Sequence, residues 1–271
     1  MKRTFLGSVT VLGLLIAAPL SIAKAADMAV KAPPPVAEVF NWSGVYIGGF
    51  VGGAFSDRNA TSTDPLSTTG FLYNGPLTNS YGLSGITAGG TIGYNYQPMG
   101  ANWLIGIEGE GGYIHLSRTI QDVNAIVDHF AFPDSLDTTR IGNGYGVVAG
   151  RLGFAADRML FYGKAGVAFV NHSYSFADNC ITGGCGGGIL NLAHSNMQVT
   201  WAAGAGFEYA VTNNWSVKGE YLYLATNQSF NTALGVSNFG DIYSNAHTDP
   251  GVHTVKAGIN YRFGGPVSAK Y

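Results

Sequence analysis

Strict alternation of apolar and polar residues runs through this chain, and it is clearest in the last predicted strand, residues 251–263. One face of that strand is apolar and ends in the aromatic residues Tyr261 and Phe263, whereas the other face carries Lys256 and Arg262. A packed protein core rarely accepts such bases, but a strand that is apolar toward lipid and polar toward a barrel interior has this pattern. The alternation therefore predicts a transmembrane β-barrel strand.

Eight segments of the chain are predicted strands: residues 43–55, 84–97, 103–115, 143–156, 159–172, 197–210, 215–228 and 251–263. Each spans about 13 residues, which is enough to cross a bilayer at a tilt. Short connections (98–102, 157–158 and 211–214) alternate with long ones (about 56–83, 116–142, 173–196 and 229–250).

An even number of strands, with short turns at one end and long loops at the other, is typical of outer-membrane barrels. The prediction is an all-β, eight-stranded antiparallel up-and-down barrel in the outer membrane of a Gram-negative bacterium. Both termini then lie in the periplasm and four long loops lie outside the cell. The alternative, a soluble lipocalin-like barrel, would be apolar inward.

The charged residues within the predicted strands lie on the face opposite the aromatic residues. In segment 103–115, for example, Glu108 and Glu110 oppose Trp103 and Tyr113. A base that faced lipid near the bilayer centre would cost about 2–4 kcal/mol, so inward placement is expected. The predicted lumen charges are Glu108, Glu110, Arg151, Lys164, Glu208, Lys218, Glu220, Lys256 and Arg262.

Two interpretations of these lumen charges stay open at this point. Eight strands enclose only enough space for side chains to fill. The charges could therefore form a salt-bridge network that plugs the lumen. Alternatively, they could line a gated and very narrow ion path.

Composition supports a membrane barrel. Only 11% of the residues are charged, against about 25% in ordinary soluble proteins, whereas there are 40 Gly, 15 Tyr and 15 Phe. No run of about 18 apolar residues follows the N-terminal segment, so no transmembrane helix is predicted. The net charge of −2 gives no reason to expect a nucleic-acid partner.

The two ends of the chain have their own signals. Residues 1–26 are predicted to be a signal peptide, with a basic start, a short apolar core at 9–18 and small residues at 23–25. Residues 27–40 are a Pro-rich segment expected to be a periplasmic linker. The barrel then occupies residues 41–263, and 264–271 form a C-terminal tail.

The loops carry a few candidate chemical groups. Cys180 and Cys185 flank the sequence ITGG in an exported chain, which predicts a disulfide. No loop has a dense carboxylate spacing, so neither a metal nor a cofactor is expected, although weak divalent-cation binding stays open. His115 and Ser117 share a strand face and raise the remote alternative of a lipid A-modifying enzyme, but no orienting acid accompanies them. We expect no enzyme.

Two end motifs support a family resemblance: residues 41–49, NWSGVYIGG, and residues 255–263, VKAGINYRF. With the Pro-rich exported start, they resemble the porin-family outer-membrane β-barrels of alphaproteobacteria, the opacity-like surface antigens. The resemblance implies insertion by the barrel-assembly machinery, with Phe263 as the assembly signal although eight residues follow it.

The expected function is that of a monomeric surface protein. Its barrel would be a structural scaffold that contacts outer-membrane lipid and lipopolysaccharide, and its loops would offer a surface to an extracellular ligand. A small porin-like channel for ions or small solutes is the alternative.

Overall fold

The computed structural model describes residues 40–57, 59–64, 77–121, 126–127, 130–131, 135–179, 189–226, 229–236 and 242–264. The predicted signal peptide lies outside these residues, as do nearly all of the linker and the tail. Cys180 and Cys185 also lie outside them, so their disulfide stays a prediction.

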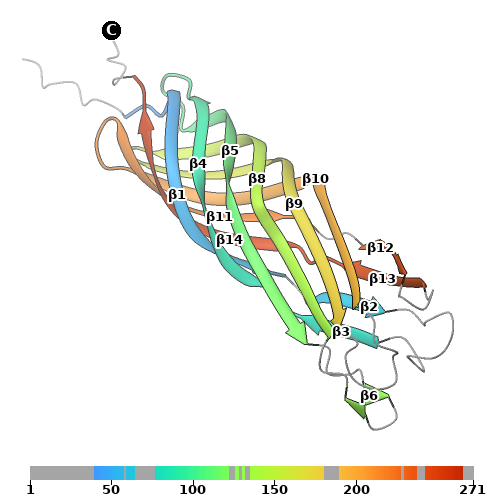
Figure 1. Cartoon of the computed structure of the whole chain (residues 1–271). Helices are drawn as coiled ribbons and strands as arrows, with labels where there is room; N and C mark the ends of the chain where they lie inside the picture. The colour runs from blue at the N-terminus through green and yellow to red at the C-terminus, as the bar shows by residue number, and fades with distance from the viewer. Residues whose placement is uncertain are drawn as a thin grey trace, which may run out of the picture. The chain divides into compact units, whose positions relative to one another are not determined.

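Eight antiparallel strands form a closed barrel (Figure 1). They are β1 (Gly44–Ser56), β4 (Ser84–Tyr96), β5 (Trp103–Gln121), β8 (Ser135–Ala156), β9 (Met159–Asn179), β10 (Ile189–Ala210), β11 (Trp215–Leu224) and β14 (Val252–Arg262). Each strand pairs with the next barrel strand along the chain, and β14 pairs with β1 to close the sheet. The predicted eight-stranded up-and-down barrel is confirmed.

The outer wall of the barrel is apolar. On β5, for example, Trp103, Ile105 and Ile107 are each at least 50% exposed, whereas the intervening face carries buried Glu108. Similar outward side chains continue on every barrel strand, from Val45 on β1 to Ile259 on β14. A soluble protein rarely exposes apolar surface on this scale, but lipid accepts it.

The two ends of the barrel differ, as predicted. At the short-turn end, β4, β8 and β10 connect to the next barrel strand through 97–102, 157–158 and 211–214. At the opposite, long-loop end, the structure adds strands where only loops were expected. β2 (Ala60–Asp64), β3 (Leu77–Tyr81), β12 (Ser229–Val236) and β13 (Ile242–Thr248) form a second sheet in the order β12-β13-β2-β3, and β6 (Ile126–Val127) pairs with β7 (Phe130–Ala131).

The predicted strand lengths were wrong at this end. β8 and β10 each have 22 residues, and β11 stops earlier than expected, at Leu224. The prediction ended each strand where apolar alternation stopped. A hydrogen-bonded ladder satisfies the backbone whether or not its side chains are apolar, so hairpins rich in Ser and Thr continue beyond the apolar wall.

The lumen is not polar throughout, which also differs from the prediction. A large apolar cluster fills the long-loop half and includes Ile114, Leu116, Ile141, Val170 and Leu222. A smaller cluster fills the short-turn end and consists of Phe40, Trp42, Leu104, Ala155, Leu160, Tyr162 and Ala210. These residues share the inward faces with the lumen charges, so the charges lie between two apolar layers.

No helix in the described part of the chain is long and apolar enough to cross a membrane.

Candidate functional site

Eight of the nine predicted lumen charges converge between the two apolar clusters. They are Glu108 and Glu110 on β5, Arg151 on β8, Lys164 on β9, Glu208 on β10, Lys218 and Glu220 on β11, and Lys256 on β14. Three pairs of these residues face each other directly across neighbouring strands. Glu208 pairs with Lys218 and Glu220 with Lys256, which are opposite charges, whereas Arg151 pairs with Lys164, which is a like charge. We call this set of eight residues the lumen network; it contains four acids and four bases.

Lys164 is the centre of the lumen network. Its Nζ lies 2.7 Å from Glu108 Oε1, 2.7 Å from Glu110 Oε2 and 2.8 Å from Glu220 Oε1. Lys256 bridges two of the same acids, with its Nζ 2.5 Å from Glu110 Oε1 and 2.7 Å from Glu220 Oε1. All five side chains are at most 1% exposed, and charges so far from water persist only when they are paired.

Arg151 connects this centre to Glu208. Its Nη2 donates to Glu208 Oε2 at 2.7 Å, and its Nη1 lies 3.6 Å from Glu108 Oε2. The guanidinium also stacks 3.6 Å from the ring centroid of Tyr162, a favourable cation–π geometry. Glu208 Oε1 in turn accepts a hydrogen bond from Asn260 Nδ2 at 2.8 Å.

Three tyrosines, which were not predicted from the sequence, bond to acids of the lumen network. Their hydroxyls donate to one carboxylate each: Tyr46 to Glu108 at 2.7 Å, Tyr145 to Glu110 at 2.6 Å and Tyr162 to Glu220 at 2.8 Å. The assumption that aromatic residues face lipid was wrong for these three. Tyr145 shares the odd-numbered face of β8 with Arg151, and Tyr162 the even-numbered face of β9 with Lys164, so strand parity could have identified these two. The segment 43–55 has no charged residue that would fix the inward face for Tyr46.

Inward glycines make room for these rings. A Cβ on Gly93 would lie 2.4 Å from the Tyr46 ring and hydroxyl, and one on Gly206 would lie 2.6 Å from the Tyr162 hydroxyl. These inward positions therefore need glycine, because any larger residue would collide with a lumen tyrosine.

Lys218 is the loosest member of the lumen network. Its Nζ lies 4.0 Å from Glu108 Oε2 and 3.4 Å from Thr91 Oγ1. The other three bases each have a carboxylate oxygen within 2.7 Å.

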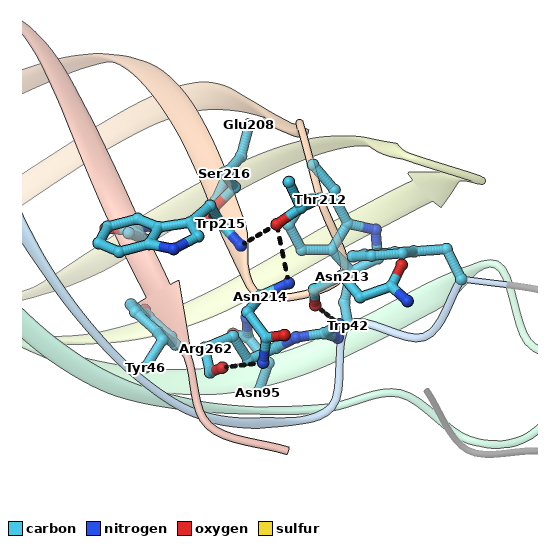
Figure 2. Close-up of a pocket in the computed structure, with 13 residues that line it drawn as sticks. Trp42, Tyr46, Asn95, Glu208, Thr212, Asn213, Asn214, Trp215, Ser216 and Arg262 are labelled. Carbon is cyan, nitrogen blue, oxygen red and sulfur yellow. Dashed lines mark hydrogen bonds between the residues drawn. The ribbon is translucent and has the colours of Figure 1, made fainter. Parts of the chain in front are cut away.

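Arg262 lies at the short-turn mouth, in a pocket that Glu208 of the lumen network also lines (Figure 2). Its Nη2 donates to Asn213 O at 2.7 Å and its guanidinium lies 4.5 Å from the ring centroid of Phe40. Within the described residues it makes no ion pair. Trp42 crosses the same mouth and donates from Nε1 to Asp157 O at 3.1 Å. The cavity among these residues is about 10 Å³, room for about one water.

A second polar cluster lies at the long-loop end. Asp249 Oδ2 is 2.8 Å from His172 Nδ1 and Asp249 Oδ1 is 2.9 Å from His247 Nε2, and all three residues are buried. Burial by itself raises the pKa of the Asp249 carboxyl, but the hydrogen bonds from the two histidines outweigh it and hold the pKa below its ordinary value of 3.8. The carboxylate therefore ties β9 to the connection between β13 and β14.

Two other groups of residues were candidates for chemistry: three glutamates that could hold a metal ion, and the pair His115 and Ser117. Glu108, Glu110 and Glu220 lie close enough together to hold an ion, but the Lys164 ammonium contacts all three. His115 points to the outer wall, where its Nδ1 bonds the Tyr113 hydroxyl at 2.9 Å. Among the described contacts, no hydrogen bond joins His115 to Ser117.

The geometry defines a class of protein: a membrane barrel with lipid-facing apolar strands and a charged interior. A family model described as "Outer membrane protein beta-barrel domain" matches residues 15–263. The 31 kDa outer-membrane immunogenic proteins of Brucella melitensis biotype 1 and Brucella suis biovar 1 are each 31% identical over 256 residues, covering 89% of this chain and 93% of the relative. The chain belongs to this family of outer-membrane β-barrel proteins, and the predicted resemblance to alphaproteobacterial members is confirmed.

Solved structures of other barrels are more distant. Ail, the attachment invasion locus protein of Yersinia pestis, is 14% identical with a TM-score of 0.37, covering 82% of this chain and 99% of that chain. The outer membrane protein OprG of Pseudomonas aeruginosa is 12% identical with a TM-score of 0.41, covering 82% and 96%.

Proposed function

We propose that this protein is a non-conducting outer-membrane scaffold that displays its long-loop end outside the cell. The observation that carries the proposal is the filled lumen. Eight buried charges neutralise one another, and an apolar cluster lies on each side of them. A hydrated ion would have to separate close ion pairs and also enter two dry layers, both of which are costly.

The proposed orientation places the short turns and both termini in the periplasm. This is the usual arrangement of outer-membrane barrels. Phe263 follows β14 directly, and its ring is exposed and packs edge-on against Tyr261 at 5.1 Å. An aromatic residue at this position suits a role as the signal for the barrel-assembly machinery. Lipid and lipopolysaccharide would then surround a monomeric barrel.

The extended strands and the second sheet suit a display role. They continue the hydrogen-bonded sheet beyond the apolar wall, and loops positioned by a scaffold commonly carry recognition. The relatives in Brucella are called immunogenic, which is consistent with a surface that antibodies can reach. Among the described contacts, the pair His115 and Ser117 shares no hydrogen bond, and the weak 3.5 Å contact of Thr139 Oγ1 uses the same His247 Nε2 that bonds Asp249, so we propose no enzymatic role.

A narrow channel is the second candidate, and Lys218 is the observation that favours it. Because Lys218 has no carboxylate of a described residue closer than the 4.0 Å to Glu108, it could move more easily than the other bases. The two apolar clusters would still have to open.

Liposome swelling and surface labelling test the proposal. We expect that liposomes containing folded protein swell no faster in small sugars than protein-free liposomes. We also expect that a peptide tag inserted in the 65–76 segment binds antibody on intact cells, whereas a tag in the 98–102 turn does not. Rapid swelling, or antibody binding to the turn tag alone, would contradict the proposal.

A further inference from the structure

A pocket of about 270 Å³, lined mostly by residues with polar side chains, opens on the outer wall of the barrel, toward the long-loop end. Three neighbouring strands contribute two outward side chains each: Thr138 and Arg140 on β8, Ser173 and Ser175 on β9, and Ala193 and Ser195 on β10. The ladder register places these side chains in two rows. Arg140 pairs with Ser173, which pairs with Ser195; Thr138 pairs with Ser175, which pairs with Ala193.

The pocket lies just past the end of the apolar wall. On the membrane side of the pocket, the nearest large outward apolar residues are Phe169 on β9 and Met197 on β10, and one further exposed apolar residue, Leu136 on β8, lies on the loop side. Ser173 is four residues beyond Phe169, about 13 Å along the strand, which is about 9 Å along the membrane normal at the usual tilt of such strands. Ser195 is two residues beyond Met197. The pocket therefore borders the hydrocarbon, in the layer of the lipid headgroups.

Arg140 is the charged side chain of this pocket, and it has no partner among the residues that the structure describes. It makes no hydrogen bond or ion pair with any described residue, and its Nε is buried without an acceptor. The side chain as a whole is partly exposed, so the desolvation cost falls on Nε, which has lost water without compensation from the protein.

A β-bulge adjoins Arg140. The register of β8 against β9 shifts between Ile141 and Tyr145, and the bulge holds Gly142 at φ 122° and Asn143 at φ 76°. A positive φ at a residue other than glycine is costly, and bulges commonly re-aim a neighbouring side chain.

The chemistry of the pocket fits a phosphate group. Guanidinium binds phosphate oxygens through paired charge-assisted hydrogen bonds, and the surrounding hydroxyls can donate to the remaining oxygens. The side chains that line the pocket include no carboxylate to repel an anion. A neutral sugar would use the hydroxyls but would leave the arginine unpaired.

We propose that this pocket binds the phosphate group of a phosphorylated lipid headgroup, with Arg140 as the main contact. In the orientation proposed above, that headgroup belongs to the outer leaflet of the outer membrane; only this assignment of leaflet rests on the proposed function. The site would hold a lipid at a defined position on the barrel wall.

Titration calorimetry of the refolded protein in non-ionic detergent tests the proposal. The probes are a short-chain phosphatidic acid, the diacylglycerol of the same chain length, and inorganic phosphate. The variants are Arg140→Gln and Arg140→Lys, with Arg118→Gln as the matched control. Arg118 is exposed, lies at the same end of the barrel and pairs in the ladder with Thr139, next to Arg140, but it does not line the pocket. Heat-modifiable gel mobility verifies that each variant is folded.

We expect that phosphatidic acid binds the wild-type protein and that diacylglycerol does not. Arg140→Gln should weaken binding about tenfold or more, Arg140→Lys should fall between that variant and wild type, and Arg118→Gln should match wild type. Weaker binding of inorganic phosphate, also lost in Arg140→Gln, would support the phosphate contact.

Four results would overturn the proposal. Equal losses in Arg140→Gln and Arg118→Gln would indicate general charge attraction. Equal binding of diacylglycerol would indicate that the acyl chains, and not the phosphate, are recognised. Equal affinity for inorganic phosphate would indicate a free anion rather than a lipid. If the wild-type protein binds none of the probes, the pocket is not a phosphate-binding site. None of these results bears on the sealed lumen, which swelling tests separately.

Discussion

Replacing Lys164 with Met should destabilise the barrel far more than the same change at Lys218. Both lysines are buried members of the lumen network, so the two substitutions remove the same atoms and the same charge. Lys164 contacts three carboxylates within 2.8 Å, whereas the nearest carboxylate to Lys218 is 4.0 Å away. Loss of one partner from a close buried pair costs about 3–5 kcal/mol.

The magnitude follows from what each substitution leaves behind. Without Lys164, Glu108 loses its closest base, while Glu110 and Glu220 both depend on Lys256. Without Lys218, each of these acids keeps its close partner. We therefore expect a loss of about 3–5 kcal/mol for Lys164→Met and less than about half of that for Lys218→Met. Removing one of the stranded acids as well, in Lys164→Met/Glu220→Gln, should recover part of the loss.

Urea unfolding of the refolded protein in lipid vesicles measures these free energies. Tryptophan fluorescence and heat-modifiable mobility should report the same transition. With a dependence of about 1–3 kcal/mol per M of urea, the expected loss for Lys164→Met moves the midpoint by about 1 M or more. Equal shifts for the two lysine variants, or no coupling in the double variant, would refute the assignment of Lys164 as the centre of the lumen network.

Two further predictions concern the long-loop end and the lumen packing. Because folding lowers the pKa of Asp249, the stabilising contribution of this carboxylate is present above its ordinary pKa of 3.8 and is lost as pH falls through the lower folded pKa. The difference in unfolding free energy between wild type and Asp249→Asn should therefore shrink from pH 6 toward about pH 3. A constant difference would contradict the pairing of Asp249 with the two histidines. Gly93→Ala should lower the unfolding free energy by about 1–3 kcal/mol, because the added Cβ would meet the Tyr46 ring. Gly111→Ala, with no atom within 4 Å of its Cβ, should be neutral or slightly stabilising in the same unfolding assay. Similar losses at both glycines would mean that the Tyr46 ring does not pack against Gly93.

The barrel could be predicted from the sequence because its signal is local. A strand has a period of two residues, so the placement of Trp103 and Glu108 on opposite faces follows from spacing alone. The same spacing brought eight charged side chains to one lumen. The identity of each ion pair did not follow, because it depends on the stagger between strands and not on any single strand.

The remaining features depend on contacts between distant parts of the chain. His172 and Asp249 are 77 positions apart (249 − 172) and meet only when β9 lies beside the β13–β14 connection. Trp42 closes the short-turn mouth by bonding to Asp157, 115 positions away. The inward tyrosines were missed for a different reason: lipid-facing aromatic residues are common in such barrels, and that expectation outweighed the parity of Tyr162.

Single-channel conductance of the refolded protein in a planar lipid bilayer tests the sealed lumen most directly. Wild type would be measured beside Glu220→Ala, which breaks the lumen network, and Arg118→Gln, which alters an exposed charge at the long-loop end. Heat-modifiable mobility would verify folding in each case. We expect no reproducible steps from wild type or from Arg118→Gln. Reproducible steps from wild type, with a size or ion selectivity that changes in Glu220→Ala but not in Arg118→Gln, would contradict the sealed lumen and identify a narrow channel.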